Sequence, residues 1–321
     1  MKLGVLSVLL GDLSLEETCK FLSEQGVTAI ELGAGGYTSN VHCNPEVLLH
    51  DEKKYEEFIS TLKKYNLEVS ALSPHGNPVH PDKAVAESFD KAFKNAVLLA
   101  EKMGVERVIT FSGCPGGSKE DKTPNWVTCA WPTDYQQILK YQWDEVLIPY
   151  WQKTAEFCRQ HHVNKIAFEM HPGFCVYNPE TLLRLRDAVG PEIGANFDPS
   201  HLIWQGIDPV AAIRELKDCM FHFHAKDTRI DKYNAAKNGV LDTKTFDKVA
   251  ERGWAFRTVG YGTSLEQWKE IVSALRTIGY DFVMSIEHED ALMSPTEGLK
   301  KAIALLKQAM TFEGTGAIWW A

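Results

Sequence analysis

Long apolar runs are missing from this sequence of 321 residues. The longest one near the start, residues 3–10, has only eight residues and no small-residue cleavage pattern after it. Such a run is too short to cross a bilayer and is untypical of a signal peptide. We therefore expect a cytoplasmic protein with no membrane partner.

Paired cysteines and basic runs are missing as well. The seven cysteines are odd in number, scattered and without a C-x-x-C pair, which is typical of free thiols in a cytosolic protein. The chain has 34 Lys and Arg against 43 Asp and Glu, a net charge of −9, and no basic run exceeds three or four residues. Binding to nucleic-acid phosphates requires Lys and Arg concentrated on one face. We therefore expect no nucleic-acid partner.

Short apolar runs alternate along the chain with longer segments whose apolar residues recur every three or four positions. This alternation predicts eight strand-helix units on a parallel sheet. The predicted strands are 3–8, 28–32, 68–73, 107–111, 165–170, 193–197, 220–224 and 282–287. The predicted helical stripes lie within 15–22, 55–62, 84–103, 137–161, 179–188, 209–216, 265–278 and 295–310. Capping signals mark two helix starts, Ser14 with Glu17 and Asn178 before Pro179.

Eight such units in a chain of this length predict a (β/α)₈ TIM barrel that occupies residues 1–321 as one domain. The alternative is an open doubly wound sheet, which requires a G-x-G-x-x-G loop after the first strand; residues 11–14, GDLS, do not supply one. Two loops, at about 112–132 and 228–263, are longer than a unit needs. In a barrel both loops would lie over the face formed by the carboxyl ends of the strands, where long loops tend to be functional lids.

Four ionisable residues stand at the ends of predicted strands, namely Glu169, Asp198, His224 and Glu287. Their spacings of 29, 26 and 63 residues would bring all four to one mouth of a barrel. Three carboxylates and an imidazole that meet there would repel one another unless a divalent cation sat between them. Each residue alone could instead cap a helix or form an ion pair. Together, ionisable ends on buried strands favour a metal site.

Short motifs surround these four positions. Other motifs lie at the ends of the second and third predicted strands and in the loop at 228–263. Together, the motifs are FEMHP (168–172), NFDPSH (196–201), HFHAKD (222–227), SIEHED (285–290), IELG (30–33), SPHGNP (73–78) and RTVGYG (257–262). In this combination the chain resembles, over nearly its whole length, the sugar phosphate isomerase/epimerase family. That family has the xylose isomerase-like TIM barrel and is related to ketose 3-epimerases and inosose dehydratases. The resemblance implies one divalent metal ion, with Mn²⁺ as the first expectation and Mg²⁺, Co²⁺ or Zn²⁺ as alternatives, held by Glu169, Asp198, His224 and Glu287.

The resemblance also implies an activity, that of a sugar isomerase or epimerase with a small-molecule sugar or keto-sugar as its substrate. Glu169 and Glu287 match the two catalytic glutamates, which would exchange a proton next to a carbonyl on opposite faces of the sugar through a metal-stabilised enediolate. His201 matches the histidine that contacts the substrate in this family. The other candidates for substrate binding are His75, Glu31, Lys226 and Arg229. Glu31 and Lys226 could instead form structural ion pairs, and His75 could belong to a rigid Pro-rich loop.

The chain departs from the ketose epimerases at two positions. Their further Glu, six residues after the first metal glutamate, is replaced by Cys175, and their Arg, six residues after the metal histidine, by Ile230, with Arg229 one residue earlier. His171 instead forms E-x-H with Glu169, which places both side chains on one side of the strand end and suits a catalytic proton shuttle. Similar arrangements occur in relatives that act on 3-keto sugars or 3-keto glycosides. The alternative function is therefore a metal-dependent lyase or dehydratase on such a substrate.

Tryptophans fall in or beside the top loops, where their flat faces suit sugar CH surfaces; they are Trp126, Trp131, Trp204 and Trp254. Trp319 and Trp320 near the C-terminus favour a homo-oligomer, a dimer or a tetramer. An abasic-site endonuclease would need a three-metal cluster and a basic DNA-binding face, which the net charge of −9 opposes. A non-catalytic sugar-binding barrel would be marked by the loss of a metal ligand, and none of the four is missing.

Overall fold

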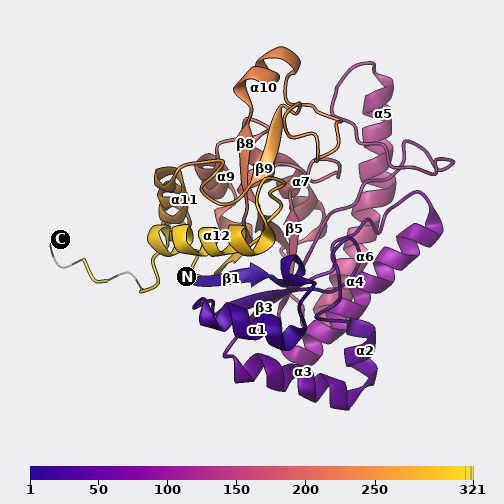
Figure 1. The fold of residues 1–321 in the computed structure, drawn as a ribbon. Coiled ribbons are helices and arrows are strands. Elements are labelled where there is room, and N and C mark those ends of the chain that lie inside the picture. Colours follow the sequence, from indigo (N-terminus) through magenta and orange to yellow (C-terminus); the bar gives the residue numbers. More distant parts are fainter. Residues whose placement is uncertain (315, 319, 321) are drawn as a thin grey trace.

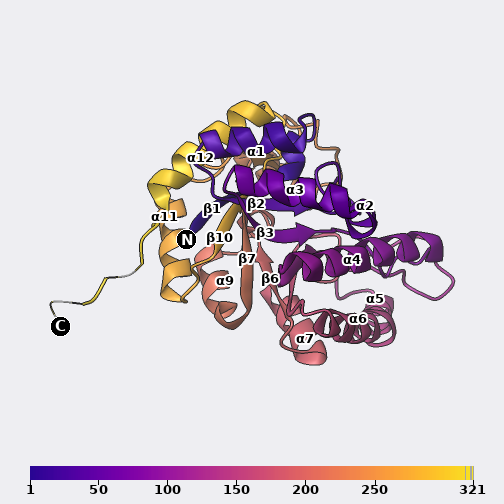
Figure 2. The same ribbon diagram turned by 90° about the horizontal axis from the view of Figure 1, so that it is seen from below.

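The computed structural model of the chain describes residues 1–314, 316–318 and 320. Eight parallel strands close into a barrel in the order β1-β10-β7-β6-β5-β4-β3-β2, and helices surround it (Figures 1 and 2). The predicted (β/α)₈ barrel is confirmed, and all eight predicted strands are present. They are β1 (Lys2–Leu6), β2 (Ala29–Gly33), β3 (Glu68–Ser73), β4 (Arg107–Thr110), β5 (Lys165–Glu169), β6 (Ile193–Phe197), β7 (Met220–Ala225) and β10 (Val283–Ile286).

Helices connect the strands along the outside of the barrel. Those predicted are α1 (Leu15–Glu24), α3 (Glu52–Lys64), α4 (Lys83–Met103), α7 (Pro179–Val189), α9 (Pro209–Glu215), α11 (Leu265–Thr277) and α12 (Pro295–Ala309). In place of one helix over 137–161 the structure has a run of α5 (Asp134–Lys140), η2 (Tyr141–Leu147) and α6 (Ile148–Gln160). The pattern did not predict the short helices α2 (Pro45–His50), α8 (Pro199–Ile203) and α10 (Lys232–Asn238), or the 3₁₀ turns η1 (Ser7–Leu10) and η3 (Lys217–Cys219).

The segment η2 is a π-helix inside the run from α5 to α6. Pro149, two residues after η2 ends, has no N–H and cannot bond to the carbonyl of Glu145 as an α-helix requires. The wider turn of a π-helix accommodates this missing bond. Its buried residue Gln142 donates hydrogen bonds to the carbonyl oxygens of Pro115 at 3.1 Å and Asn125 at 2.6 Å. The π-helix therefore anchors the long loop at 112–132.

The barrel strands are buried on both faces, and their carboxyl ends meet at one mouth. Every residue of β2, β4 and β6 is buried. The strand register pairs Glu169 with Asn196 and His224 with Ser285, so the last residues of neighbouring strands lie side by side. Asp198 and Glu287 follow directly after β6 and β10. The four predicted metal ligands therefore belong to the same mouth of the barrel.

The predicted loop at 228–263 contains regular structure of its own. β8 (Asp227–Ile230) pairs in antiparallel fashion with β9 (Trp254–Arg257), and α10 lies between them in sequence. Figure 1 shows these three elements projecting together at the top of the molecule. We call residues 227–257 the hairpin. It covers one side of the barrel mouth, because β8 follows β7 after only one residue.

The base of the hairpin is tied by one buried side chain. The Oδ2 atom of Asp227 accepts hydrogen bonds from the backbone N–H groups of Gly260 at 2.8 Å, Gly262 at 3.2 Å and Thr263 at 3.1 Å. A Cβ atom on Gly262 would lie 2.2 Å from the carbonyl oxygen of Thr228, so this close approach of the two chains requires glycine. The first residue of the hairpin thus holds the segment that comes after its last residue.

Two further expectations concern surfaces. No helix in the described part of the chain is both long enough and apolar enough to cross a membrane. Of the two C-terminal tryptophans, Trp320 is 72% exposed, and Trp319 lies outside the described residues. The homo-oligomer stays a prediction.

Both predicted capping signals are confirmed. The Ser14 hydroxyl accepts a hydrogen bond from the N–H of Glu17, whose carboxylate accepts one at 2.9 Å from the N–H of Ser14. The side chain of Asn178 accepts a hydrogen bond at 2.9 Å from the N–H of Thr181, and Pro179 begins α7.

We expect Ser14→Ala to lower the free energy of unfolding by about 1 kcal/mol, because the first turn of α1 loses its cap. Urea denaturation followed by circular dichroism measures this difference. Ser23→Ala, at an exposed position near the other end of α1, is the matched control and should leave the midpoint nearly unchanged. Equal midpoints for the two variants would contradict the role of the cap.

Candidate active site

Four predicted ligand residues meet at the barrel mouth. Glu169, Asp198, His224 and Glu287 each offer one ligand atom, and these atoms lie within 4.8 Å of one another. His224 Nδ1 is 3.1 Å from Glu169 Oε2 and 2.7 Å from Glu287 Oε2. We call these four residues the ligand cluster. The structure therefore brings together the whole set that the strand ends predicted.

The ligand cluster presents buried polar atoms that contact ionisable neighbours at ion-pair distance but make no hydrogen bond of good geometry among the described residues. They are Asp198 Oδ2, His224 Nδ1 and Glu287 Oε2. Buried polar atoms in proteins are normally bonded, so three such atoms facing one space need an explanation. One imidazole nitrogen and three carboxylates form a donor set that divalent cations accept. The residues present therefore fit a divalent metal ion.

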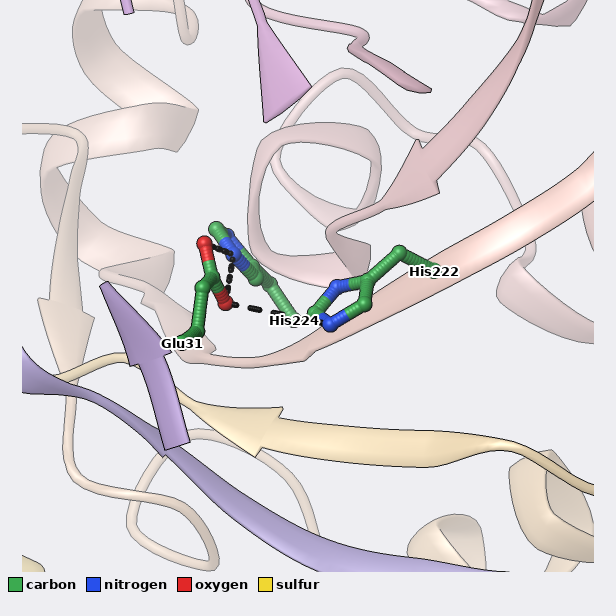
Figure 3. A group of neighbouring side chains, drawn as sticks. All are labelled: Glu31, His222 and His224. Carbon is green, nitrogen blue, oxygen red and sulfur yellow. Dashed lines mark hydrogen bonds and ion pairs between the residues drawn. The ribbon is translucent and has the colours of Figure 1, made fainter. Parts of the chain in front are cut away.

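Glu31 contacts His224 inside the barrel, and Figure 3 shows the two side chains together with His222. Both carboxylate oxygens of Glu31 lie 2.9 Å from His224 Nε2, and the Ser73 hydroxyl donates a further hydrogen bond to Glu31. Burial alone would raise the pKa of Glu31, but the charge and hydrogen bond of His224 outweigh it and lower the pKa to about 2. With its Nε2–H donated to this carboxylate, a neutral His224 would present an unprotonated Nδ1 atom to a cation in the cluster.

A second network lies beneath Glu169 inside the barrel. Asn196 Nδ2 donates a hydrogen bond to Glu169 Oε2 at 3.2 Å, and Asn196 Oδ1 accepts one from His222 Nδ1 at 3.0 Å. His222 Nε2 lies 3.2 Å from the Ser70 hydroxyl. Burial lowers the pKa of His222 to about 3, so the ring is neutral and its Nε2 atom can accept a hydrogen bond from the Ser70 hydroxyl. Both ring nitrogens of His222 are thus engaged, which makes it part of a hydrogen-bond network.

The sequence pattern missed this network. Asn196 and Ser70 lie within strands β6 and β3 that are otherwise mainly apolar, and such buried polar residues are the signal that could have found them. Ser73, at the end of β3, was missed in the same way. These side chains bond to the carboxylates and the histidines of the mouth, so they orient the groups that face the ligand space.

Two further histidines contact Glu169. His201 Nε2 is 3.1 Å from Glu169 Oε1 and 3.4 Å from Asp198 Oδ2, and His75 Nε2 is 3.3 Å from Glu169 Oε2. Burial would raise the pKa of Glu169, but the contacts with His201, His224 and His75 outweigh it and hold the pKa well below its usual range. Burial dominates at Asp198, whose pKa rises to about 6.

His171 lies beside His201, with the two ring centroids 4.1 Å apart. Its Nδ1 atom lies 2.6 Å from the carbonyl oxygen of Pro172, so this nitrogen is the protonated donor. Burial lowers the pKa of His171 to about 3, which keeps the ring neutral. The ring also packs edge-on against Phe111 at a centroid distance of 4.9 Å. His171 therefore offers an unprotonated Nε2 atom near the cluster.

Lys226 brings positive charge to the edge of the cluster. Its Nζ atom is 3.0 Å from Glu287 Oε1, 2.5 Å from Glu289 Oε2 and 3.9 Å from Asp198 Oδ2, and the residue is only 2% exposed. Burial alone would lower the pKa of Lys226, but the charges of Glu287 and Glu289 outweigh it and raise the pKa well above its usual value. Lys226 is therefore a buried ammonium group.

The remaining predicted substrate residues lie apart from the ligand space. Glu31 is fully buried behind His224 and reaches the cluster through it. Arg229 is exposed on β8, and among the described residues no contact joins it to the cluster.

Trp126, Trp204 and Trp254 line a cavity that also includes His171 and His201. Trp131 is 75% exposed.

The chain matches the sequence model of the xylose isomerase-like TIM barrel family over residues 19–309. It belongs to this family. A relative, the uncharacterized protein YfiH of Bacillus subtilis (strain 168), is 41% identical over 313 residues, 97% of this chain and 100% of YfiH. Inosose dehydratase 2 of Bacillus cereus is 28% identical over 169 residues, 49% of this chain and 54% of the dehydratase.

Solved structures share the fold of this family member over 96% of its length. The probable 3-DHS dehydratase AsbF from Bacillus anthracis has a TM-score of 0.66 at 19% identity, with 99% of that chain covered. A D-tagatose 3-epimerase-like protein has a TM-score of 0.64 at 19% identity, and the IOLI protein with a bound zinc atom has 0.66 at 18%, each with 98% of that chain covered. At these identities the likeness shows the fold alone. Relatives and structural neighbours have both dehydratase and epimerase names. Membership of the family therefore does not identify the reaction.

We expect Glu31→Gln to weaken the binding of Mn²⁺ by about 10- to 100-fold, because the amide no longer fixes the Nε2 proton of His224 as a carboxylate does. Isothermal titration of metal-free protein with Mn²⁺ measures the affinity. Glu56→Gln, at an exposed position of α3, is the matched control and should bind Mn²⁺ like the wild type. Unchanged affinity in the Glu31→Gln protein would exclude the positioning role of Glu31.

Proposed function

We propose that the protein is a divalent-metal-dependent sugar isomerase or epimerase that moves a proton next to the carbonyl of a sugar or keto-sugar through an enediolate. The observation that supports this proposal is the ligand cluster itself. Glu169 and Glu287 approach His224 Nδ1 from two different strand ends, and His224 Nδ1 and Glu287 Oε2 make no hydrogen bond of good geometry among the described residues. This arrangement offers two carboxylates on either side of one space that suits a cation.

A divalent cation in the cluster would act as a Lewis acid that makes the proton next to a carbonyl acidic. Glu169, Asp198, His224 and Glu287 would hold it, and the carboxylate-rich donor set favours Mn²⁺ as the first candidate. Mg²⁺, Co²⁺ and Zn²⁺ suit the same donors, and the IOLI neighbour carries zinc. The order in which these ions restore activity to stripped protein identifies the working metal.

The acid and base groups of the proposal are the two cluster glutamates. The Glu169 carboxylate removes a proton from one face of the sugar, and the carboxyl group of Glu287 returns a proton to the other face. Exchange of both carboxyl groups with water restores their starting states. His201, His75 and Lys226, which contact the cluster carboxylates, are the proposed partners of the sugar oxygens.

The alternative is elimination of water or of an aglycone from a 3-keto sugar or 3-keto glycoside. His171 favours it as a second candidate, because its ring lies beside His201 and its Nε2 atom carries no proton, so that this atom could take up a proton and pass it to a leaving oxygen. Both reactions begin with the same proton removal by Glu169. They differ in the step after this removal, so their products separate them.

We expect the metal-loaded protein in D₂O to introduce deuterium next to the carbonyl of its substrate. A panel of free ketoses, 3-keto sugars and 3-keto glycosides is followed by ¹H NMR, with the metal removed by a chelator as the control. Accumulation of an epimer or an aldose supports the isomerase, and release of water or an aglycone supports the lyase. Absence of exchange on the whole panel, with the metal bound, would overturn the proposal.

Glu169→Gln and Glu287→Gln are each expected to reduce turnover by about 10³-fold or more, because an amide can neither take up nor return the proton. His171→Ala is expected to slow turnover by about 10²-fold if its ring shuttles a proton. Rates are measured with the substrate that the D₂O panel identifies, and Glu56→Gln serves again as the control. Wild-type turnover in the Glu287→Gln protein would contradict the mechanism with two catalytic glutamates.

A further inference from the structure

A cavity of about 640 Å³ opens beside the ligand cluster. Its wall includes His171 and His201, and His201 Nε2 lies 3.1 Å from Glu169. The rest of the wall comes from Trp126, Thr128, residues 172–173, Trp204 and the hairpin residues 241–246, Arg252, Trp254 and Phe256. Pockets of roughly 300 to 1,000 Å³ enclose ligands larger than a simple sugar. The cavity therefore extends the site beyond the space around the cluster.

One wall of this cavity is a continuous row of aromatic rings. Trp204 and Trp254 stack with centroids 4.5 Å apart and planes at 5°, and Phe246 stacks on Phe256 at 5.5 Å and 20°. Phe256 also packs edge-on against His201 at 5.2 Å. The row thus begins at a histidine of the cluster and runs outward along the hairpin. We call these four rings the aromatic wall.

The charged groups of the cavity are already engaged within the hairpin. Asp242 pairs with Lys244 Nζ at 2.9 Å and accepts the N–H of Gly253 at 2.8 Å. Arg252 is 2% exposed, donates to the carbonyl oxygen of Trp254 at 3.2 Å, and lies over the ring of Phe246 at 4.4 Å. A second sugar ring would need several free donors and acceptors for its hydroxyls. The buried indole N–H groups of Trp126 and Trp204 have no hydrogen-bond partner among the described residues, but they are donors only, and the remaining wall offers aromatic faces.

The outer end of the aromatic wall is exposed. Phe246 is 55% exposed and Leu241 70% exposed, although the neighbouring Trp204 and Trp254 are each only 6% exposed. Folding of the hairpin therefore leaves part of Phe246 uncovered beside a cavity. A flat apolar group that enters the cavity would cover this ring and stack on it.

We propose that the aromatic wall binds a flat, apolar ring attached to the sugar, so that the substrate is a glycoside or another sugar derivative with an aromatic substituent. The inference rests on the proposed function, because the sugar part must lie at the ligand cluster. The shared histidines His171 and His201 place the two parts of such a substrate next to each other.

The test compares paired ligands that have the same sugar with and without a ring. Mn²⁺-loaded protein is titrated calorimetrically with the 4-nitrophenyl and the methyl β-glycosides of glucose, galactose and xylose. We expect the nitrophenyl member of at least one pair to bind about tenfold more tightly, or ~1.4 kcal/mol. Equal affinities in every pair, including failure of all nitrophenyl glycosides to bind at millimolar concentration, would overturn the proposal.

Phe246→Ala should remove most of this preference and leave the affinity for the methyl glycoside unchanged. Phe312→Ala is the matched control, because Phe312 is similarly exposed, at 52%, and does not line the cavity. Full preference in the Phe246→Ala protein would overturn the assignment. Quenching of tryptophan emission by the nitrophenyl group in the wild type, expected from stacking near Trp254, reports the same contact without a substitution.

The D₂O assay with unsubstituted keto-sugars does not depend on the aromatic wall. Deuterium exchange without any preference for nitrophenyl glycosides would refute the role of the aromatic wall in binding a ring and would leave the proposed reaction standing. Preference for the ring without exchange on any substrate would keep the wall as a binding site and refute the reaction.

Discussion

The electrostatic cost of placing several carboxylates at one buried barrel mouth is the constraint on which the site depends. Glu31, Glu169 and Asp198 are buried, and Glu287 joins them at the edge. Like charges this close disfavour one another's ionisation. The surrounding groups offset the cost by hydrogen bonding and positive charge: histidines contact Glu31 and Glu169, and Lys226 contacts Glu287. A divalent cation would complete the balance.

Much of the fold and the four cluster residues could be predicted from the sequence, because both depend on local order. A parallel barrel brings every strand end to one mouth, so an ionisable residue at a strand end is already placed once the strand is recognised. The contact of Glu31 with His224 could not be predicted in the same way, since 193 residues separate them and only closure of the barrel makes them neighbours. The sequence therefore left open whether Glu31 binds substrate or forms an ion pair, and the structure shows its contact with His224.

The elements that escaped prediction are short or depend on distant partners. β8 and β9 have four residues each, too few for a clear alternation, and they exist as a pair across an insertion of more than twenty residues. The break in the helix over 137–161 had a local signal in Pro149, which removes one backbone donor. What the proline alone does not reveal is that the π-helix presents Gln142 to three carbonyl groups of a loop.

Asp227 anchors the base of the hairpin, so the base and the outer segment of the hairpin differ in how they are held. Asp227, which ties the base of the hairpin to residues 260–263, comes directly after Lys226 in the chain, so the base of the hairpin adjoins the ammonium group beside Glu287. Among the described residues, Asp227 makes no hydrogen bond to the outer segment between α10 and β9. Movement of this outer segment would therefore leave the base of the hairpin, and the ammonium group of Lys226 next to it, in place.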